Sequence, residues 1–241
     1  MLKLGVIGGL GPMATALFMQ MVIEMTDAET DQEHIEMLIH NCPSVPDRTR
    51  YILGKSDLNP EPYMAEIGCS LAKAGADLIA IPCITANYFY DSMSNEIPVP
   101  IINTIEETTN YLIHADIHTV GLMATDGTIQ SGLFQKSLTD AGINVIIPSE
   151  SKQKDVMHII YDNVKANKSV SMEKFISVSE EMTDKGAETI ILGCTELSVV
   201  RMNYPLGAGY LDAMQVMAKC AVEKCGRLRQ EYNDLITKDG A

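Results

Sequence analysis

Short runs of β-branched and apolar residues alternate along the chain with longer stretches of helical periodicity. The apolar runs predict strands over residues 4–7, 35–40, 78–81, 99–102, 119–123, 144–147 and 189–192. Helices are predicted over residues 12–26, 60–75, 104–115, 128–141, 154–167, 171–186 and 210–233. This alternation is typical of an α/β protein with parallel sheets.

Two pairs of segments repeat a common pattern. Residues 75–83 and 186–194 align without a gap at an offset of 111 residues (186 − 75), and each segment ends in a cysteine. A weaker match relates residues 5–11 to residues 121–127 at an offset of 116 residues (121 − 5). Because the two offsets are similar, we expect two similar Rossmann-like α/β domains, related by a pseudo-two-fold axis.

Composition narrows the class of protein. The chain has 18 Lys plus Arg against 32 Asp plus Glu, a formal net charge of −14, and no basic cluster, which disfavours nucleic-acid binding. Its apolar runs are shorter than the roughly 20 residues of a membrane span, so no membrane partner is expected. The first residues lack the pattern of a signal peptide, which predicts a cytoplasmic protein with six reduced cysteines.

The repeated cysteines, Cys83 and Cys194, follow predicted strands. In parallel α/β sheets, ligands bind at the carboxyl ends of the strands, where loops lead into helices. A helix N-terminus favours the thiolate and lowers the pKa of a cysteine. If the two halves face each other, the two thiols approach one molecule from opposite sides. One thiolate could then remove an α-proton while the other thiol delivers a proton to the opposite face.

Several motifs occur together in one order: GGLGPMAT at 8–15, PDRT at 46–49, PCITA at 82–86, ATDGT at 124–128 and LGCTEL at 192–197. On these motifs the sequence resembles the aspartate/glutamate racemase family of cofactor-independent amino-acid racemases, most closely its aspartate racemase branch. The resemblance extends along nearly the whole chain. Glu196 follows the second Cys-Thr, as in the aspartate branch, where glutamate racemases usually have a histidine.

The resemblance implies a racemase that acts on aspartate and needs no cofactor. It implies that Cys83 and Cys194 are the two acid/base residues, that Arg48 binds a substrate carboxylate, and that Lys165 faces the site. The other substrate-binding residues that we expect are Gly9, Met13, Thr85, Thr125 and Thr195.

The same resemblance implies a domain organisation. We expect an N-terminal domain over residues 1–97, completed by residues 206–241, and a second domain over residues 98–205, with the site between them. The expected partners are a small-molecule amino-acid substrate and a second copy of the chain in a homodimer.

Two positions depart from the family pattern, since Ile84 stands where an asparagine is common and Asn87 where a histidine is common. These changes leave open a racemase of glutamate or of another amino acid. They also leave open a non-racemase relative, such as a small-acid binding protein, a hydantoin racemase or a decarboxylase.

Two other classes of site are less well supported. Gly9, Gly11 and Ala14 match a minimal dinucleotide fingerprint, but the next predicted strand ends in His40-Asn41 instead of an acidic residue. No metal site is predicted, because the histidines at 114 and 118 fall across a helix end.

Overall fold

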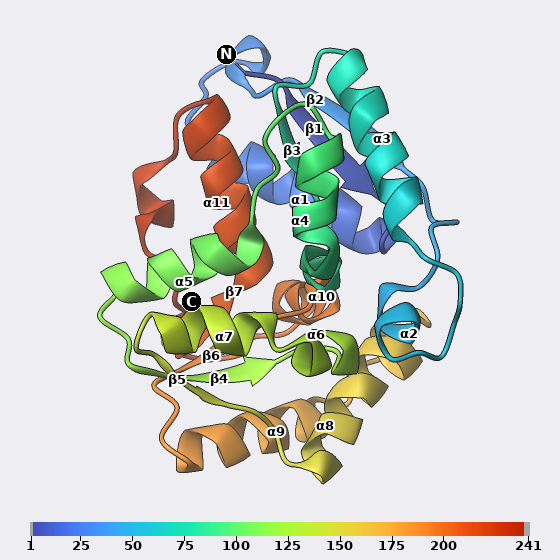
Figure 1. Cartoon of the computed structure of the whole chain (residues 1–241). Coiled ribbons are helices and arrows are strands. Elements are labelled where there is room, and N and C mark those ends of the chain that lie inside the picture. Colours follow the sequence, from blue (N-terminus) through green and yellow to red (C-terminus); the bar gives the residue numbers. More distant parts are fainter. Residues whose placement is uncertain (1, 239–241) are drawn as a thin grey trace.

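The computed structural model of the chain describes residues 2–238, which form two parallel β-sheets (Figure 1). The first sheet has the strand order β2-β1-β3, and the second has the order β5-β4-β6-β7. The strands are β1 (Leu4–Gly8), β2 (Met37–Asn41), β3 (Leu78–Ala80), β4 (Thr119–Met123), β5 (Asn144–Ile146), β6 (Thr189–Leu192) and β7 (Tyr210–Asp212). All neighbouring strands are parallel, which confirms the predicted fold class.

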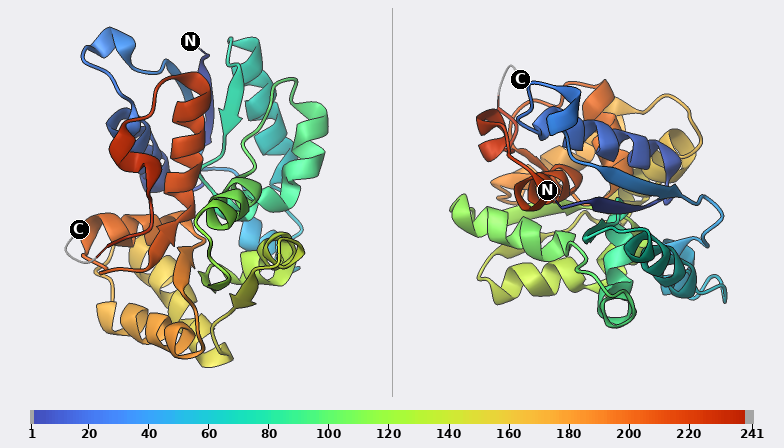
Figure 2. Two further views of the ribbon diagram at one scale, coloured as in Figure 1. Left: turned by 90° about the vertical axis from the view of Figure 1, so that its left-hand side faces the viewer. Right: turned by 90° about the horizontal axis from the view of Figure 1, so that it is seen from above.

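Helices connect the strands and cover both sheets, and Figure 2 shows this arrangement from two further sides. The α-helices are α1 (Pro12–Met25), α2 (Arg48–Ile52), α3 (Glu61–Lys73), α4 (Tyr90–Glu96), α5 (Thr104–His114), α6 (Asp126–Ser131), α7 (Leu133–Asp140), α8 (Glu150–Met157), α9 (Met172–Asp184), α10 (Thr195–Asn203) and α11 (Ala213–Cys225). Shorter helical segments are η1 (Asp31–Glu33), η2 (Ile84–Phe89), the π-helix η3 (His158–Val164) and η4 (Gln230–Asn233).

The two sheets share one topology. The predicted repeat relates β1 to β4 and β3 to β6. Correspondingly, β1 is adjacent to β3 in the first sheet, and β4 is adjacent to β6 in the second. The similarity continues beyond the strands: the Ile79 N–H donates to the Pro100 carbonyl and the Ile190 N–H donates to the Gly209 carbonyl, each at 2.8 Å. The expectation of two similar Rossmann-like halves is therefore confirmed.

Two predictions near the sheet edges are wrong. Residues 99–102 form only one bridge, between Ile79 and Ile101, and not a strand. Pro98 and Pro100 lack the N–H groups that a strand needs. Conversely, β7 lies at the start of the predicted helix 210–233, because the Asp212 side chain accepts the Met214 N–H and begins α11 there. Residues 210–212 thus belong to the second sheet, beyond the predicted limit of the second domain at residue 205.

Other helix predictions differ in their boundaries. The predicted helix 128–141 is divided into α6 and α7 at Gly132, which has a φ of 68°. A positive φ suits glycine and interrupts a right-handed helix. The predicted helix 154–167 begins earlier, as α8, and continues as the π-helix η3.

Each half packs its last helix against the other half. The helix α5 follows the first sheet but packs on α7, while α11 follows the second sheet and packs on α1 and α5. The largest apolar core accordingly joins residues of both halves, including Phe18, Leu122 and Met217. Because this core is continuous, the division into domains at residues 97/98 and 205/206 stays a prediction.

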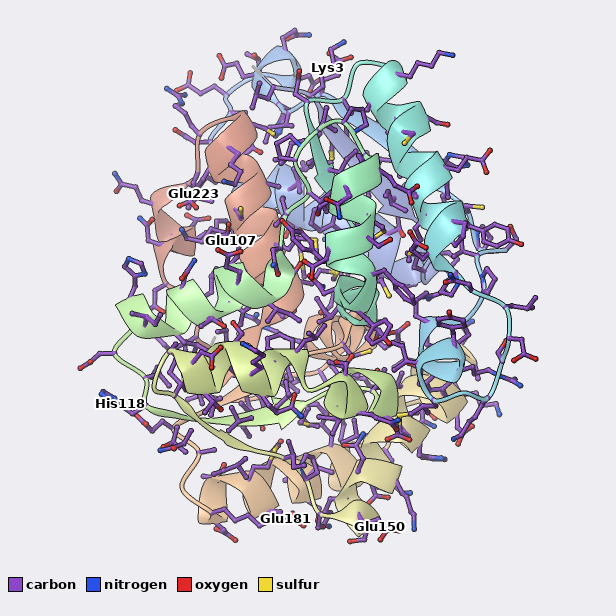
Figure 3. The ribbon with its side chains drawn as sticks, in the orientation of Figure 1. Lys3, Glu107, His118, Glu150, Glu181 and Glu223 are labelled. Carbon is purple, nitrogen blue, oxygen red and sulfur yellow. The ribbon has the colours of Figure 1, made fainter. Side chains whose placement is uncertain are left out.

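Charged side chains such as Lys3, Glu150 and Glu181 lie at the outside of the molecule (Figure 3). Several form ion pairs one helical turn apart, such as Glu150 with Lys154 at 2.9 Å and Glu181 with Lys185 at 2.7 Å. Such exposed pairs contribute little to stability. Among residues 2–238, no helix has both the length and the apolar character needed to cross a membrane.

Candidate active site

Cys83 and Cys194 occupy equivalent places in the two halves. Cys83 follows β3 and directly precedes η2, and Cys194 follows β6 and directly precedes α10. Both residues have extended backbones, with φ of −156° and −146°. They are buried, with exposed fractions of 6% and 5%, and they line the same small cavity. The structure therefore brings the two predicted cysteines together from the two sheets.

This cavity has a volume of about 10 Å³, which is roughly the space of one water molecule. The predicted site residues on its wall are Cys83, Cys194, Arg48, Thr85, Thr125, Thr195 and Lys165. The predicted residues Gly9 and Met13 line a neighbouring cleft of about 910 Å³. The residues that line both spaces are Leu10, Asp47, Arg48, Lys165 and Glu196. The cavity is too small for an amino acid, and these shared residues form the wall that separates it from the larger cleft.

Arg48 lies beside Cys83. Its terminal nitrogens donate to the carbonyls of Pro46 at 2.9 Å, Val45 at 3.3 Å and Leu10 at 2.5 Å. Its Nε is buried and has no hydrogen-bond partner within residues 2–238. Burial lowers the pKa of Arg48, but the interactions with Cys83, Asp47 and Glu196 together outweigh burial and raise the pKa overall. Arg48 is thus a cation on the cavity wall beside Cys83.

Cys194 has a different neighbour. Its Sγ donates to Oε2 of Glu196 at 2.9 Å, and Oε1 of the same carboxylate pairs with Lys165 Nζ at 2.8 Å. Burial and then the Glu196 charge raise the pKa of Cys194, while Lys165 acts in the opposite direction. The expectation that a helix N-terminus lowers the thiol pKa is therefore wrong for Cys194, because burial and the carboxylate outweigh the helix.

A cluster of hydroxyl groups joins the two halves, and two of its members, Thr85 and Thr125, lie on the cavity wall. Thr85 Oγ1 lies 3.1 Å from Thr125 Oγ1 and 3.0 Å from Thr128 Oγ1, and the latter two are 3.1 Å apart. Thr125 Oγ1 also accepts the Thr128 N–H and so caps α6. Each hydroxyl carries one proton and two lone pairs, so the cluster can both donate to and accept from a ligand.

The π-helix η3 brings a further residue, Tyr161, to the cavity. The Tyr161 hydroxyl donates to Oδ2 of Asp47 at 3.1 Å, and Asp47 caps α2 by accepting the Arg50 N–H at 2.8 Å. Burial raises the pKa of Tyr161. Lys165 follows one turn later and lies 5.3 Å from the centre of the Tyr161 ring. Short π-helical segments are common at functional sites.

Some residues of the cavity were not predicted from the sequence: Leu10, Asp47, Thr49, Tyr161 and Glu196. Asp47 and Thr49 lie within the PDRT motif and Glu196 within the second cysteine motif, so motif membership was the available signal. Tyr161 lies four residues before Lys165, which is the spacing of one helical face.

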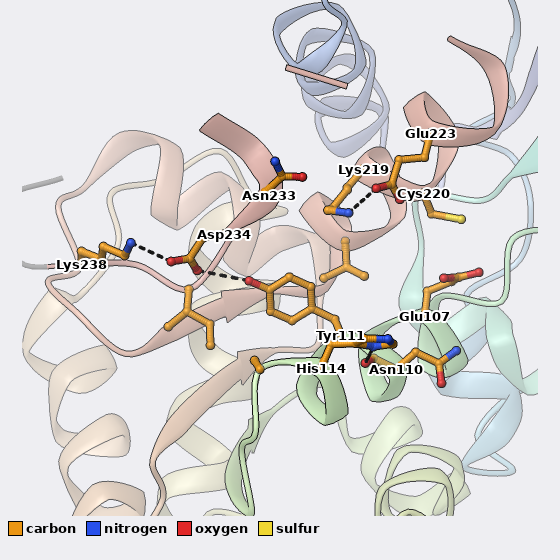
Figure 4. A pocket seen from close by; sticks show the side chains of 13 residues that line it. Glu107, Asn110, Tyr111, His114, Lys219, Cys220, Glu223, Asn233, Asp234 and Lys238 are labelled. Carbon is orange, nitrogen blue, oxygen red and sulfur yellow. Dashed lines mark hydrogen bonds and ion pairs between the residues drawn. The ribbon is translucent and has the colours of Figure 1, made fainter. Parts of the chain in front are cut away.

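A separate pocket of about 810 Å³ lies between α5, α11 and the segment after η4 (Figure 4). Ion pairs line it, between Lys219 and Glu223 and between Lys238 and Asp234. It contains Cys220, which lies on a helix as predicted, but neither Cys83 nor Cys194. The two-cysteine chemistry therefore belongs to the small cavity and not to this pocket.

Comparison with known proteins agrees with the motifs. Residues 7–221 match the family model for Asp/Glu/hydantoin racemases. The chain belongs to this family. It is 28% identical over 225 residues to the broad specificity amino-acid racemase RacX of Bacillus subtilis, covering 91% of this chain and 96% of that protein. Family membership confirms the resemblance and supports isomerase activity.

Solved structures of racemases are similar to this chain as well. The aspartate racemase of Picrophilus torridus superposes with a TM-score of 0.81 at 27% identity, covering 95% of this chain and 97% of that one. A glutamate racemase from Francisella tularensis shares the fold, with a TM-score of 0.66 at 17% identity and coverage of 95% and 84%. The likeness therefore extends over nearly the whole of each chain.

Proposed function

We propose that the protein is a cofactor-independent amino-acid racemase in which Cys83 and Cys194 are the two acid/base groups and aspartate is the preferred substrate. The observation that carries this proposal is the placement of both cysteines on one buried cavity, each at the end of an equivalent strand. Membership of the racemase family supports it.

The proposed reaction needs one thiolate and one thiol. The thiolate of one cysteine removes the α-proton, and the thiol of the other cysteine gives a proton to the opposite face of the carbanion. For the other enantiomer, the two roles are exchanged. Neither cysteine forms a bond to carbon, so the reaction changes only the positions of protons.

Two cations favour an acidic substrate. Arg48 and Lys165 both line the cavity and the cleft beside it, so each can meet a carboxylate as the wall opens. The hydroxyls of Thr85, Thr125 and Thr195 supply donors and acceptors for the amino-acid group. The similarity to an aspartate racemase points in the same direction.

A second candidate is a racemase of another amino acid, glutamate included. Ile84 is buried and lines the cavity, so it offers an apolar surface to the substrate. The similarity to a broad specificity racemase is consistent with this candidate.

The test is proton NMR of the purified protein with L-aspartate in D2O, combined with chiral analysis and without added pyridoxal phosphate. We expect loss of the α-proton signal and the appearance of D-aspartate. If L-aspartate is unchanged while glutamate or an apolar amino acid exchanges its α-proton, aspartate is the wrong substrate. If no amino acid exchanges, the racemase proposal is wrong.

A further inference from the structure

We propose that Glu196 accepts the proton of Cys194, so that one half of the site contains a cysteine–glutamate pair and the other half a cysteine alone. This inference rests on the proposed racemase function and deepens it. The observation behind it is the contact of one carboxylate with two groups: Oε2 of Glu196 accepts from Cys194 Sγ at 2.9 Å, and Oε1 pairs with Lys165 at 2.8 Å.

The carboxylate is held in a buried position. Glu196 is 5% exposed and lies in the first turn of α10, directly after Cys194 and Thr195. Thr195 Oγ1 donates to the same Oε2 at 3.4 Å. Since an unpaired buried carboxylate is costly, Glu196 needs a cation or a proton, and Lys165 supplies the cation in this structure.

Proton transfer along this contact balances without any other reactant. The S–H bond of Cys194 breaks and an O–H bond forms at Oε2 of Glu196. The Cys194 thiolate then removes the α-proton and becomes a thiol again, while the Cys83 thiol gives its proton to the opposite face. Loss of the Glu196 proton to solvent and uptake of a proton by Cys83 restore the starting state.

Substrate binding favours this transfer. Lys165 and Glu196 both belong to the wall between the cavity and the cleft, so an entering carboxylate meets Lys165 there. When Lys165 pairs with the substrate, Glu196 loses its cation, and a buried carboxylate without a cation binds a proton more strongly. We therefore place the transfer of the Cys194 proton to Glu196 in the substrate complex.

Other charged groups face the pair from neighbouring elements. Tyr161 belongs to η3, Lys165 directly follows η3, and Arg48 belongs to α2. Cys83 lies across the cavity, at the end of β3. Among residues 2–238, no carboxylate is bonded to the Cys83 sulfur as Glu196 is to Cys194. The proposal thus predicts that loss of Glu196 affects one proton-transfer direction only.

Racemisation rates cannot show that Glu196 acts in one direction only. The equilibrium constant between two enantiomers is one, so kcat/KM has the same value in both directions. Elimination of HCl can reveal it. We would use the 2R and 2S forms of 3-chloroaspartate, which lose the α-proton to a single cysteine and then chloride, and whose enamine product hydrolyses to oxaloacetate and ammonia. The variant Cys194→Ser identifies the enantiomer that Cys194 deprotonates.

We expect Glu196→Gln to slow elimination from that enantiomer by about 10²-fold, the usual contribution of a positioned proton acceptor, and to change elimination from the other enantiomer by less than about 3-fold. Glu196→Asp, which keeps the carboxylate, should recover part of the loss. Glu180→Gln, an exposed residue on α9, is the matched control. Equal losses from both enantiomers, or no loss from either, would overturn the proposal.

Alkylation by iodoacetamide tests the contact without any turnover. Because Glu196 contributes to the raised pKa of Cys194, Glu196→Gln should shift the alkylation of Cys194 to lower pH by about 1 unit, with Cys83 as the internal reference. If wild-type protein acts on neither chloroaspartate nor aspartate, the aspartate proposal fails, and this shift alone decides the inference. The inference about Glu196 would be overturned if the pH dependence of Cys194 alkylation did not shift, or if that of Cys83 shifted equally.

Discussion

The two cysteines stand at equivalent positions of a repeated fold, yet their surroundings differ. The offset of 111 residues that relates Cys83 to Cys194 also relates Thr85 to Glu196. Thr85 belongs to a hydroxyl cluster, whereas Glu196 accepts a hydrogen bond from the Cys194 thiol. The repeated backbone fixes where each thiol lies, and the residue two positions later determines the chemistry around it.

The cations near the two cysteines, Arg48 and Lys165, also differ in how they contact the sulfur atoms. Arg48 follows the outer strand β2 of the first sheet and interacts directly with the Cys83 sulfur. Lys165 follows the outer strand β5 of the second sheet, through α8 and η3, but Glu196 lies between Lys165 and the sulfur of Cys194. A cation therefore lies beside the sulfur in the first half, whereas a carboxylate stands between the cation and the sulfur in the second half.

The largest expected effect comes from removing either thiol. We expect Cys83→Ser and Cys194→Ser each to reduce racemisation by about 10²–10⁴-fold, since a hydroxyl is a far weaker base. Each variant should retain HCl elimination from only one enantiomer of 3-chloroaspartate. Cys69→Ser, on α3, is the control and should racemise at the wild-type rate. A cysteine variant with wild-type racemisation would remove that thiol from the proposed mechanism.

The positions of the two cysteines could be predicted from the sequence, but the different surroundings of the two thiols could not. The two cysteines, their strands and their opposed halves followed from a repeat in the chain and from the periodicity of apolar residues. The Glu196 carboxylate was visible only as part of a motif, because its contact with Lys165 depends on how α10 meets η3. Contacts between elements distant in the chain leave no local pattern.

The same limit explains the errors in the fold. The strand β7 is too short to show periodicity and exists because it pairs with β6. Residues 99–102 have the apolar character of a strand but the prolines of a loop, and the prolines determined the outcome. Tyr161 reaches the cavity through a π-helical segment, and that distortion was not predicted.

A smaller effect is expected from changing the cation at Cys83. Arg48→Met should slow the alkylation of Cys83 near neutral pH by about 10-fold and leave Cys194 unaffected, because it removes the positive charge beside one sulfur only. Mass spectrometry of the two cysteine peptides gives both rates from one sample. Arg48→Lys keeps the charge but loses the planar fork, so its rate of Cys83 alkylation should lie between the rates of wild type and Arg48→Met.

Arg48 also bonds the carbonyls of Leu10, Val45 and Pro46, so Arg48→Met should be less stable than wild type. Thermal unfolding of both variants separates this loss from the charge effect. If Arg48→Lys and Arg48→Met slow the alkylation of Cys83 equally, the effect comes from the lost backbone contacts. The proposed electrostatic difference between the two cysteines would then be wrong.

The smallest effect is expected in the hydroxyl cluster that contains Thr85. Thr128→Val removes one hydroxyl without changing the shape of the side chain, and Thr85 and Thr125 can still bond to each other at 3.1 Å. We expect a loss of about 1 kcal/mol in the free energy of unfolding, measured by urea denaturation, and a change in racemisation of less than about 3-fold. Thr139→Val, exposed on α7, is the matched control for the substitution itself.

This variant sharpens the comparison because it tests whether Thr85 and Glu196 have different tasks. If the cluster only joins the halves, stability falls and racemisation is retained, and the chemical asymmetry rests on Glu196. If Thr128→Val instead reduces racemisation strongly at unchanged stability, the hydroxyls take part in the reaction. Both halves would then supply a proton-transfer partner two positions after their cysteine, one a hydroxyl and the other a carboxylate.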